Sequence, residues 1–138
     1  LRSFGLTLAG GSTLDLDLQS PSAYDRLEVV GNVVLGAQIS LNLALSYNPT
    51  DYVDTFTIIS NDGIEPVMHS NGWFYFGQQR LDEGGEFFAG EQAFQISYAG
   101  GDGNDVVLRA VPEPSASLLA LTGFAAFAAR RRTRCPVR

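Results

Sequence analysis

Two stretches of this 138-residue chain repeat one pattern: LTLAGGSTLDLDL at residues 6–18 and VVLGAQISLNLAL at residues 33–45. Their apolar residues alternate with polar ones, so a strand would send one set inward and the other toward water. Five apolar residues of the first stretch each have an apolar partner 27 positions later: Leu6, Leu8, Leu14, Leu16 and Leu18 correspond to Val33, Leu35, Leu41, Leu43 and Leu45. A fixed offset of roughly 20–50 residues is typical of a solenoid, in which each coil stacks on the one before. The repeat predicts a β-helix-like stack over residues 4–45, against the alternative of coincidence in a leucine-rich alternating sequence.

The offset is lost from Asp54 onward, although the alternation continues. Strands are expected at residues 54–60, 72–77, 93–98 and 104–110, joined by turns rich in glycine, asparagine and aspartate. We interpret these strands as an antiparallel cap on the stack. The predicted fold class is therefore all-β, with β-helix or solenoid-like rungs and an antiparallel β cap, followed by a short hydrophobic C-terminal helix.

The last 28 residues are of a different kind. Val111–Ser115 reads VPEPS, residues 116–129 are uncharged and mostly Leu, Phe and Ala, and the arginines Arg130, Arg131 and Arg132 follow. As a helix, the fifteen uncharged residues from Ser115 to Ala129 span about 22 Å against the ~30 Å core of a bilayer, which suits a marginal, removable membrane anchor. Arginine clusters stay on the cytoplasmic side, so the three arginines set the orientation and the body lies outside. We divide the chain into a β-rich extracellular domain at 1–110 and a tail at 111–138.

The order of these blocks resembles the PEP-CTERM protein-sorting signal of Gram-negative bacteria. The resemblance implies that a membrane-embedded protease, the exosortase, recognises Pro112, Glu113 and Pro114, cuts at or near them, and leaves the body at the outer envelope or released. The two prolines fix φ and remove two backbone donors, so this segment stays extended and open to a protease. The alternative is a buried C-terminal helix of a soluble domain.

A second resemblance covers about residues 5–109. The segments YDRLEV at 24–29, TFTIISNDG at 55–63 and FQISYAGGDGNDVVL at 94–108 resemble the terminal region of bacterial proteins built from autotransporter-associated β-strand repeats. That resemblance implies a surface-displayed β-solenoid closed just before its sorting tail. Residues 73–76, WFYF, are more aromatic than the family pattern, and they either fill a core strand or form a surface that stacks on sugars.

Charge separates the body from the tail and narrows the partners. Before Pro112 there are four arginines, no lysine and fourteen acidic residues, and five arginines with Glu113 follow. An acidic body repels phosphates, so no nucleic-acid partner is expected. Cys135 is alone, which excludes a disulfide framework. The chain starts at Leu1 without a leader, so we expect it to be the C-terminal part of something longer, or its start to be misassigned.

No arrangement of catalytic residues is visible. His69 is the only histidine, and Asp15 and Asp17 on one strand face are interpreted as solvated charge rather than an acid/base pair. The stretch GGDGNDVVL at residues 100–108 fits the calcium-binding nonapeptide, but it occurs once, and such sites are shared between repeats. A structural turn is the favoured interpretation. We therefore expect no enzyme, no cofactor and no metal site.

Two functions are consistent with these patterns. The first is an exported cell-surface or matrix protein with a structural or adhesive role, anchored briefly at the inner membrane, processed by an exosortase, and lying among extracellular polysaccharide. The alternative is the C-terminal cap and sorting tag of a larger secreted protein that binds or acts on carbohydrate.

Overall fold

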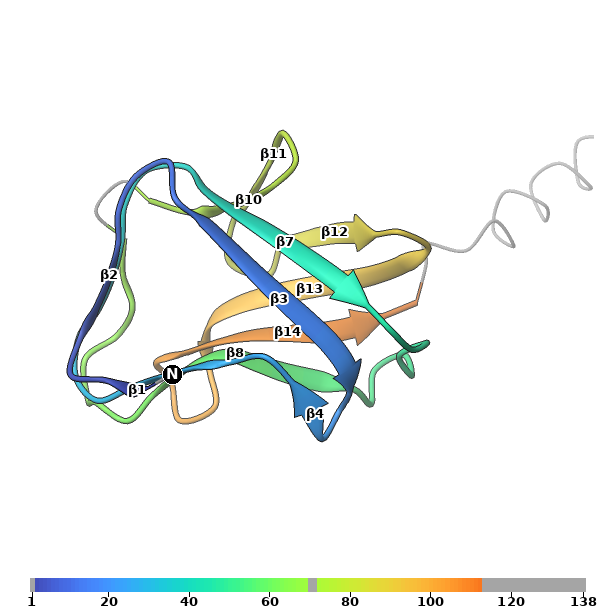
Figure 1. Ribbon diagram of the computed structural model, residues 1–138, viewed down its shortest axis with the longest axis horizontal. Coiled ribbons are helices and arrows are strands. Elements are labelled where there is room, and N and C mark those ends of the chain that lie inside the picture. The colour runs from blue at the N-terminus through green and yellow to red at the C-terminus, as the bar shows by residue number, and fades with distance from the viewer. Residues whose placement is uncertain (1, 70–71, 113–138) are drawn as a thin grey trace, which may run out of the picture.

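The computed structural model describes residues 2–69 and 72–112, and these form an all-β structure, as the sequence predicted (Figure 1). Its strands are β1 (Arg2–Ser3), β2 (Leu6–Leu8), β3 (Thr13–Ser20), β4 (Ala23–Tyr24), β5 (Leu27–Val29), β6 (Val33–Leu35), β7 (Ile39–Leu45), β8 (Thr55–Asn61), β9 (Met68–His69), β10 (Phe74–Phe76), β11 (Gln79–Leu81), β12 (Glu86–Ala89), β13 (Gln92–Gly100) and β14 (Asp105–Val111). Within the described ranges no helix is long and apolar enough to cross a membrane. The predicted C-terminal helix lies outside the described residues.

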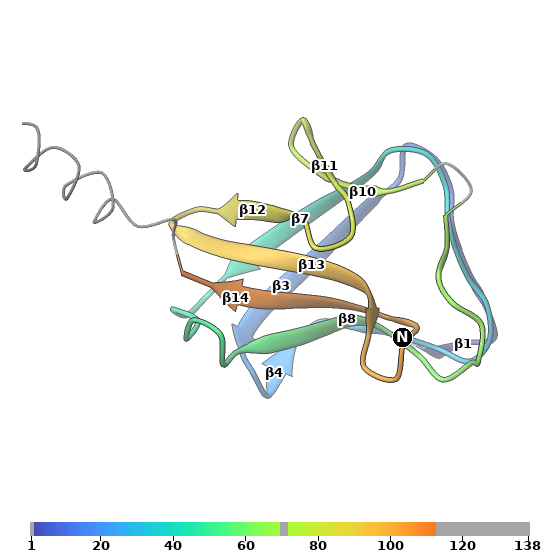
Figure 2. The same ribbon diagram turned by 180° about the vertical axis from the view of Figure 1, so that it is seen from behind.

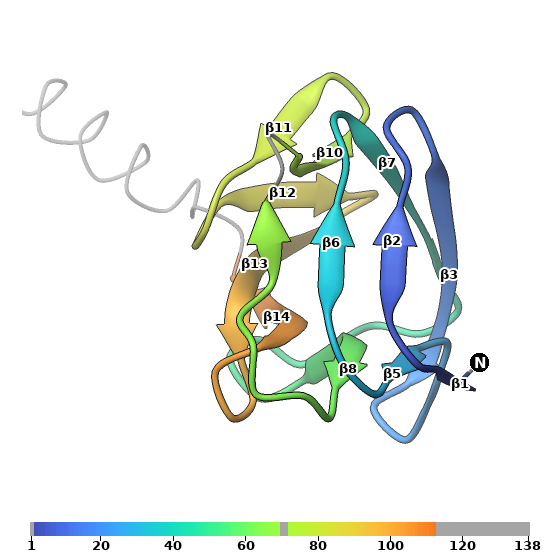
Figure 3. The same cartoon turned by 90° about the vertical axis from the view of Figure 1, so that its left-hand side faces the viewer.

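The chain winds through three sheets in three successive passes, which we call coils. Coil one is β1, β2 and β3; coil two is β5, β6 and β7; coil three is β8, β9 and β10. Within each sheet, every strand of these coils pairs in parallel with its counterpart in the neighbouring coil. Figure 3 shows β2 and β6 side by side on the face that the three-stranded sheet forms.

The 27-residue offset is the pairing register of the first two coils. Leu6 pairs with Val33 across β2 and β6, and Leu14 pairs with Leu41 across β3 and β7. The third coil has no such fixed offset, because Leu27 pairs with Ile59, 32 positions later, and Ile39 pairs with Phe74, 35 positions later. The longer loop between β7 and β8 accounts for the first change in spacing.

The expected antiparallel cap is correct only in part. The strand at residues 55–61, β8, pairs in parallel with β5 as well as antiparallel with β14, and the strand at 74–76, β10, pairs in parallel with β7. Assigning both strands to an antiparallel cap was wrong, because extra loop residues hid their repeat. The antiparallel part comprises β12, β13 and β14, which extend the six-stranded sheet beyond β8, and β11, which pairs with β10 (Figure 2).

One continuous apolar core lies between the sheets. Inward residues of coil two are almost completely buried, with Val33, Leu35 and Ile39 each 0% exposed. Aromatic rings extend this core toward β12–β14, where Phe56 packs edge-on against Phe94 with centroids 6.1 Å apart. Such ring pairs add to the free energy gained by burying their area.

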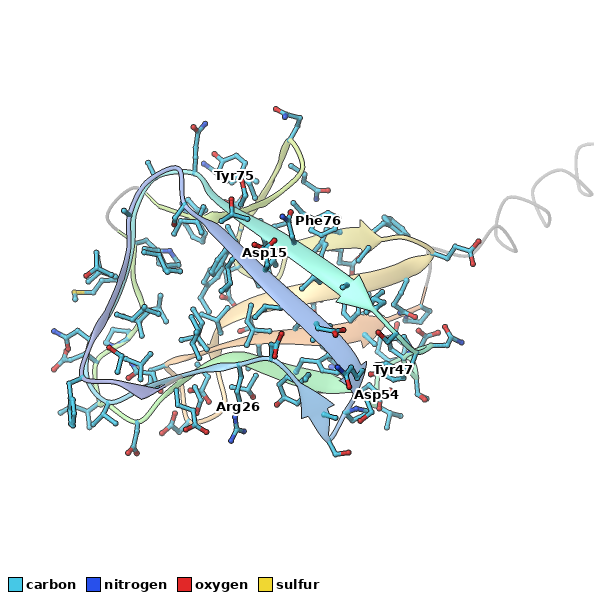
Figure 4. The ribbon with its side chains drawn as sticks, in the orientation of Figure 1. Asp15, Arg26, Tyr47, Asp54, Tyr75 and Phe76 are labelled. Carbon is cyan, nitrogen blue, oxygen red and sulfur yellow. The ribbon has the colours of Figure 1, made fainter. Side chains whose placement is uncertain are left out.

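The aromatic segment at residues 73–76 mainly serves this core. Phe74 is fully buried, and Trp73 and Phe76 pack against the core from the side. Figure 4 shows the labelled Tyr75 and Phe76 in the upper half of the molecule, with Phe76 farther inside the outline. Tyr75 pairs with Ser40 and with Arg80, so it is on the other face of the strand from its two phenylalanine neighbours.

Glycines at one corner allow the coils to stack closely. A Cβ atom on Gly36 would lie 2.8 Å from the carbonyl oxygen of Leu8, and a Cβ on Gly72 would overlap the carbonyl oxygen of Gly36. The Gly36 amide donates to the Leu8 carbonyl at 2.8 Å, which fixes coil two against coil one at this corner. No larger residue fits there without moving backbone.

Candidate functional site

The end of β14 is the point at which the folded body meets the tail. Val111, the last residue of the strand, pairs with Ala93 on β13 and is only 5% exposed. Pro112 follows directly and is half-buried. Of the residues predicted to act in sorting, Pro112 is described, whereas Glu113, Pro114, Arg130, Arg131 and Arg132 lie outside the described residues.

The loop between β7 and β8 holds β14 beyond the end of its pairing with β8. That pairing stops at Arg109 and Thr55. Beyond it, the Tyr52 amide donates to the Ala110 carbonyl at 2.8 Å, and the Ala110 amide donates to the Asp54 carbonyl at 2.9 Å. β14 is therefore fixed on both sides almost to its last residue.

Gln92 secures the last carbonyl of the strand. Its Nε2 donates to the carbonyl oxygen of Val111 at 3.1 Å and lies 3.2 Å from Oδ1 of Asp51. The side chain thus links the turn between β12 and β13, the loop before β8 and the end of β14. Three separate segments converge where the tail leaves the body.

Asp54 links the two ends of this loop by hydrogen bonds. It is 9% exposed, and its Oδ2 accepts hydrogen bonds from the Thr50 amide at 2.7 Å and from the Tyr47 hydroxyl at 3.4 Å. Figure 4 shows Tyr47 and Asp54 close together at this end of the molecule. Burial, and then the negative charge of Asp54, raise the pKa of Tyr47 to about 12.

Two apolar side chains of the same loop point into solvent. Tyr52 is 60% exposed and Val53 is 70% exposed. Tyr52 has φ of 60°, a left-handed conformation that an aromatic residue adopts at a cost of about 1–2 kcal/mol. The guanidinium carbon of Arg109 lies 5.3 Å from the Tyr52 ring centroid. The loop therefore presents an aromatic–aliphatic pair in a fixed, strained conformation.

A groove of about 400 Å³ lies at this end of the body. Its apolar side is formed by Leu43, Leu45 and Tyr47, and its opposite side by the β12–β13 turn, including Glu91 and Gln92. The groove exists because β10 pairs with β7 only at Ile39 and Ser40, so the rest of that β7 edge has no strand partner within the described ranges. We call Tyr52, Val53 and this groove together the exit surface.

The calcium-like motif acts as a turn in this structure. Oδ1 of Asp105 accepts from the Asn61 amide at 2.7 Å, and the Asn104 side-chain amide donates to the Gly63 carbonyl. Asp102 and Asp105 line a hollow of about 380 Å³ with Glu28 and Asp62. Across residues 2–69 and 72–112, no group of three or more His, Cys, Asp or Glu side chains is arranged to hold a metal ion. The motif's described bonds tie β13 and β14 to coil three.

The other singled-out residues also have structural partners. Asp15 accepts from the Asn42 side chain at 2.8 Å on the outer face of the β3–β7 pair. His69 bonds through Nδ1 with the Gly72 carbonyl at 2.9 Å and stacks on Trp73 with centroids 4.2 Å apart. The Arg80 guanidinium also lies 5.7 Å from the Trp73 ring centroid. Trp73 is thus engaged with neighbours instead of offering a free ring for a sugar.

Sequence reasoning did not find the exit surface. Tyr52 and Val53 give one weak signal, because they stand side by side between Asp51 and Asp54 and so interrupt the alternation. The bond from Tyr52 to Ala110 joins residues 58 positions apart, and no local pattern reveals it.

This geometry defines an all-β body whose last strand leads directly into a C-terminal signal. Residues 110–132 match the model of the PEP-CTERM protein-sorting motif. Proteins with this motif are exported and anchored in the membrane before cleavage, and the motif implies the exosortase as the processing partner. The chain therefore carries the signal of an exported protein that is sorted in an exosortase-dependent way.

The comparisons support nothing beyond the tail. No curated protein matches the chain, and no solved structure matches it. The resemblance to autotransporter-associated repeat proteins is therefore not supported by them.

Proposed function

We propose that this chain is a structural or adhesive protein of the cell surface or extracellular matrix, and that the exosortase removes its tail at or near Pro112–Pro114. One observation carries the proposal: β14 ends at Val111, and the matched sorting motif starts at residue 110. The folded body and the signal thus meet without an intervening linker, so a cut after β14 frees the whole fold.

The parts of the tail have separate tasks in this proposal. Pro112, Glu113 and Pro114 form the recognition segment, in which Glu113 is the only charge. The apolar run at residues 116–129 holds the segment at the membrane. Arg130, Arg131 and Arg132 keep the C-terminus on the cytoplasmic side and thereby orient the signal.

We interpret the three coils and the antiparallel strands as the end of a β-solenoid with its cap. The parallel, in-register coils support this interpretation, as does the acidic, lysine-free surface, which suits an extracellular location. Extracellular polysaccharide is the proposed surrounding of the body. Its outer sheet faces offer neutral and acidic hydrogen-bonding groups such as Asp15 and Asn42.

The alternative function is that of a cap and sorting tag of a larger carbohydrate-binding or carbohydrate-active protein, in which an upstream domain would pack on the open edge of coil one. Leu6, Leu8 and Leu14 are half-buried, whereas their partners Val33, Leu35 and Leu41 are at most 1% exposed. This edge is open at β2 and at the start of β3, before β4 pairs with β3 at Leu18 and Ser20, and either a further coil or another domain would cover it. Sequencing of the coding region upstream separates the two: more alternating repeats favour the first function, and a catalytic or lectin-like domain favours the second.

Two variants of the tail test the sorting proposal. We expect Glu113→Ala, and separately replacement of Arg130, Arg131 and Arg132 by serine, to leave the protein unprocessed or misplaced in the producing cells. The readout is the mass and the cell fraction of the protein. Normal sorting of both variants would contradict the proposal.

A further inference from the structure

We propose that the exosortase docks on the folded body through the exit surface, in addition to recognising the Pro112–Pro114 motif. This inference rests on the proposed processing at Pro112–Pro114. It assigns a partner to a surface that the motif itself does not include.

The motif follows the last strand of the fold directly. Val111 is paired in the sheet and buried, so the three motif residues begin directly at its edge. Three extended residues reach about 10 Å at most. A protease that closes around any bond of Pro112–Pro114 therefore must lie against the end of the body, where the loop at residues 50–54 and the β12–β13 turn converge.

The exit surface carries side chains of the kinds that bind proteins. Tyr52 and Val53 are exposed although both are apolar, and the backbone that carries them is held by the bonds from Thr50 to Asp54 and from Tyr52 to Ala110. A prepositioned side chain loses little conformational entropy on binding. Tyrosine and arginine are enriched among the residues that dominate protein–protein affinity, and Arg109 lies beside the Tyr52 ring.

The groove beside Tyr52 and Val53 offers a second place for a partner to bind. Its apolar wall of Leu43, Leu45 and Tyr47 lies next to Gln92, which bonds the Val111 carbonyl. Its β7 edge carries backbone groups without a strand partner among the described residues. A protruding segment of the protease can fill such a groove and hydrogen-bond along its edge.

Charge favours a protein partner over the lipid surface. Asp51 and Glu91 are exposed around the exit surface and outnumber the exposed Arg109 beside Tyr52, so an anionic lipid surface would repel this end. The complementary partner has an apolar protrusion for the groove and basic residues at its rim. The exosortase is the protein that the sorting motif brings to this position.

The test compares cleavage rates in the producing cells by pulse-chase labelling. The variant is Tyr52→Asn with Val53→Ser, chosen because asparagine tolerates the left-handed conformation. The matched control is Phe4→Ser with Ile64→Ser, because these two side chains are 93% and 94% exposed. Phe4 lies in coil one and Ile64 follows the end of β8 that is farther from the exit surface. Circular dichroism of each purified chain confirms that the body is folded.

We expect the exit-surface variant to be cleaved roughly tenfold more slowly, which corresponds to a loss of about 1.4 kcal/mol of docking free energy. The control should be cleaved at the normal rate within about twofold. An eight-residue Gly-Ser insertion between Val111 and Pro112 should slow cleavage similarly, because it uncouples body from motif. Combining the insertion with the exit-surface variant should add nothing.

Each result has one meaning. Normal cleavage of the exit-surface variant, or equal slowing of the control, overturns the docking inference while leaving the sorting proposal intact. Absence of cleavage in the unmodified chain, with the protease present, overturns the sorting proposal itself. If the exit-surface variant is cleaved at the normal rate by detergent-purified exosortase, its slow cleavage in cells reflects lost binding to lipid. That result would overturn docking on the protease.

Discussion

The backbone amide of Tyr52 donates to the carbonyl oxygen of Ala110 at 2.8 Å, and this bond joins the loop before β8 to the strand that leads into the sorting motif. The same loop supplies Asp54, whose carbonyl accepts from the Ala110 amide. A loop inserted between coil two and coil three thus fixes the last residues before the tail. The insertion that disturbs the repeat is also the element that shapes the exit surface.

Asp54 should be the residue on which this loop depends. We expect Asp54→Ala to lower the free energy of unfolding by about 1–3 kcal/mol, because the Thr50 amide and the Tyr47 hydroxyl lose a buried acceptor. Urea denaturation of the full chain measures the change. Asp62→Ala is the control, since Asp62 is exposed, and it should change the unfolding free energy by less than about 0.5 kcal/mol. Equal effects of the two substitutions would refute the role of Asp54.

Stability should fall at high pH partly because of Tyr47. In the folded state the pKa of Tyr47 is raised to about 12, whereas in the unfolded chain tyrosine ionises near its usual pKa of about 10. The folded state therefore holds the phenol proton more tightly than the unfolded state does. This contribution is fully present below about pH 10 and is lost between about pH 10 and 12 as the unfolded state releases its proton first. Unfolding midpoints measured against pH should show a shallower decline in Tyr47→Phe. An identical decline in both proteins would contradict this assignment.

The glycine corner predicts a large cost for one methyl group. In Gly72→Ala the new Cβ would overlap the Gly36 carbonyl, so we expect a loss of about 1–3 kcal/mol or more in unfolding free energy. Gly90→Ala is the control. It has open space around its Cβ and a φ of 66°, so only the backbone strain of about 1 kcal/mol should appear. Thermal or urea unfolding of both variants measures the two changes in unfolding free energy. An unchanged unfolding free energy in Gly72→Ala would mean that the coils are not packed this closely.

The open edge of coil one predicts unequal effects at equivalent positions. Leu41 is 1% exposed and Leu14 is half-buried, although the two residues pair directly across β3 and β7. We expect Leu41→Ala to cost about 2–5 kcal/mol and Leu14→Ala clearly less, because truncating a fully buried leucine also leaves a cavity. Denaturant titration measures both. Equal costs would show that Leu14 is covered as completely as Leu41.

The sequence allowed the β class and the first register to be predicted because both depend on local alternation. Leu14 and Leu41 sit on the same face at a constant offset, so periodicity alone aligned them. The third coil could not be aligned in this way, since the longer loop before β8 changes the offset from 27 to 32 residues. A fixed-period comparison has no means of detecting a strand pair that follows an insertion.

The candidate site divides in a similar way. The order of Pro112, the apolar run and the arginines is a linear signal, and it is read directly from the chain. The exit surface brings together Leu43, Tyr52 and Gln92, which lie far apart in sequence. The loop that carries Tyr52 reaches this place because it bonds to Ala110 on β14, which lies between β8 and β13. Only the folded chain brings these residues together.

The most direct test of this account is the intact mass of the mature protein from the producing cells, compared with a strain that lacks the exosortase. We predict a chain ending near Pro112–Ser115 when the protease is present, and the full tail when it is absent. An uncleaved chain in both strains would contradict the account, since the body would then keep its tail and the exit surface would have no protease to meet.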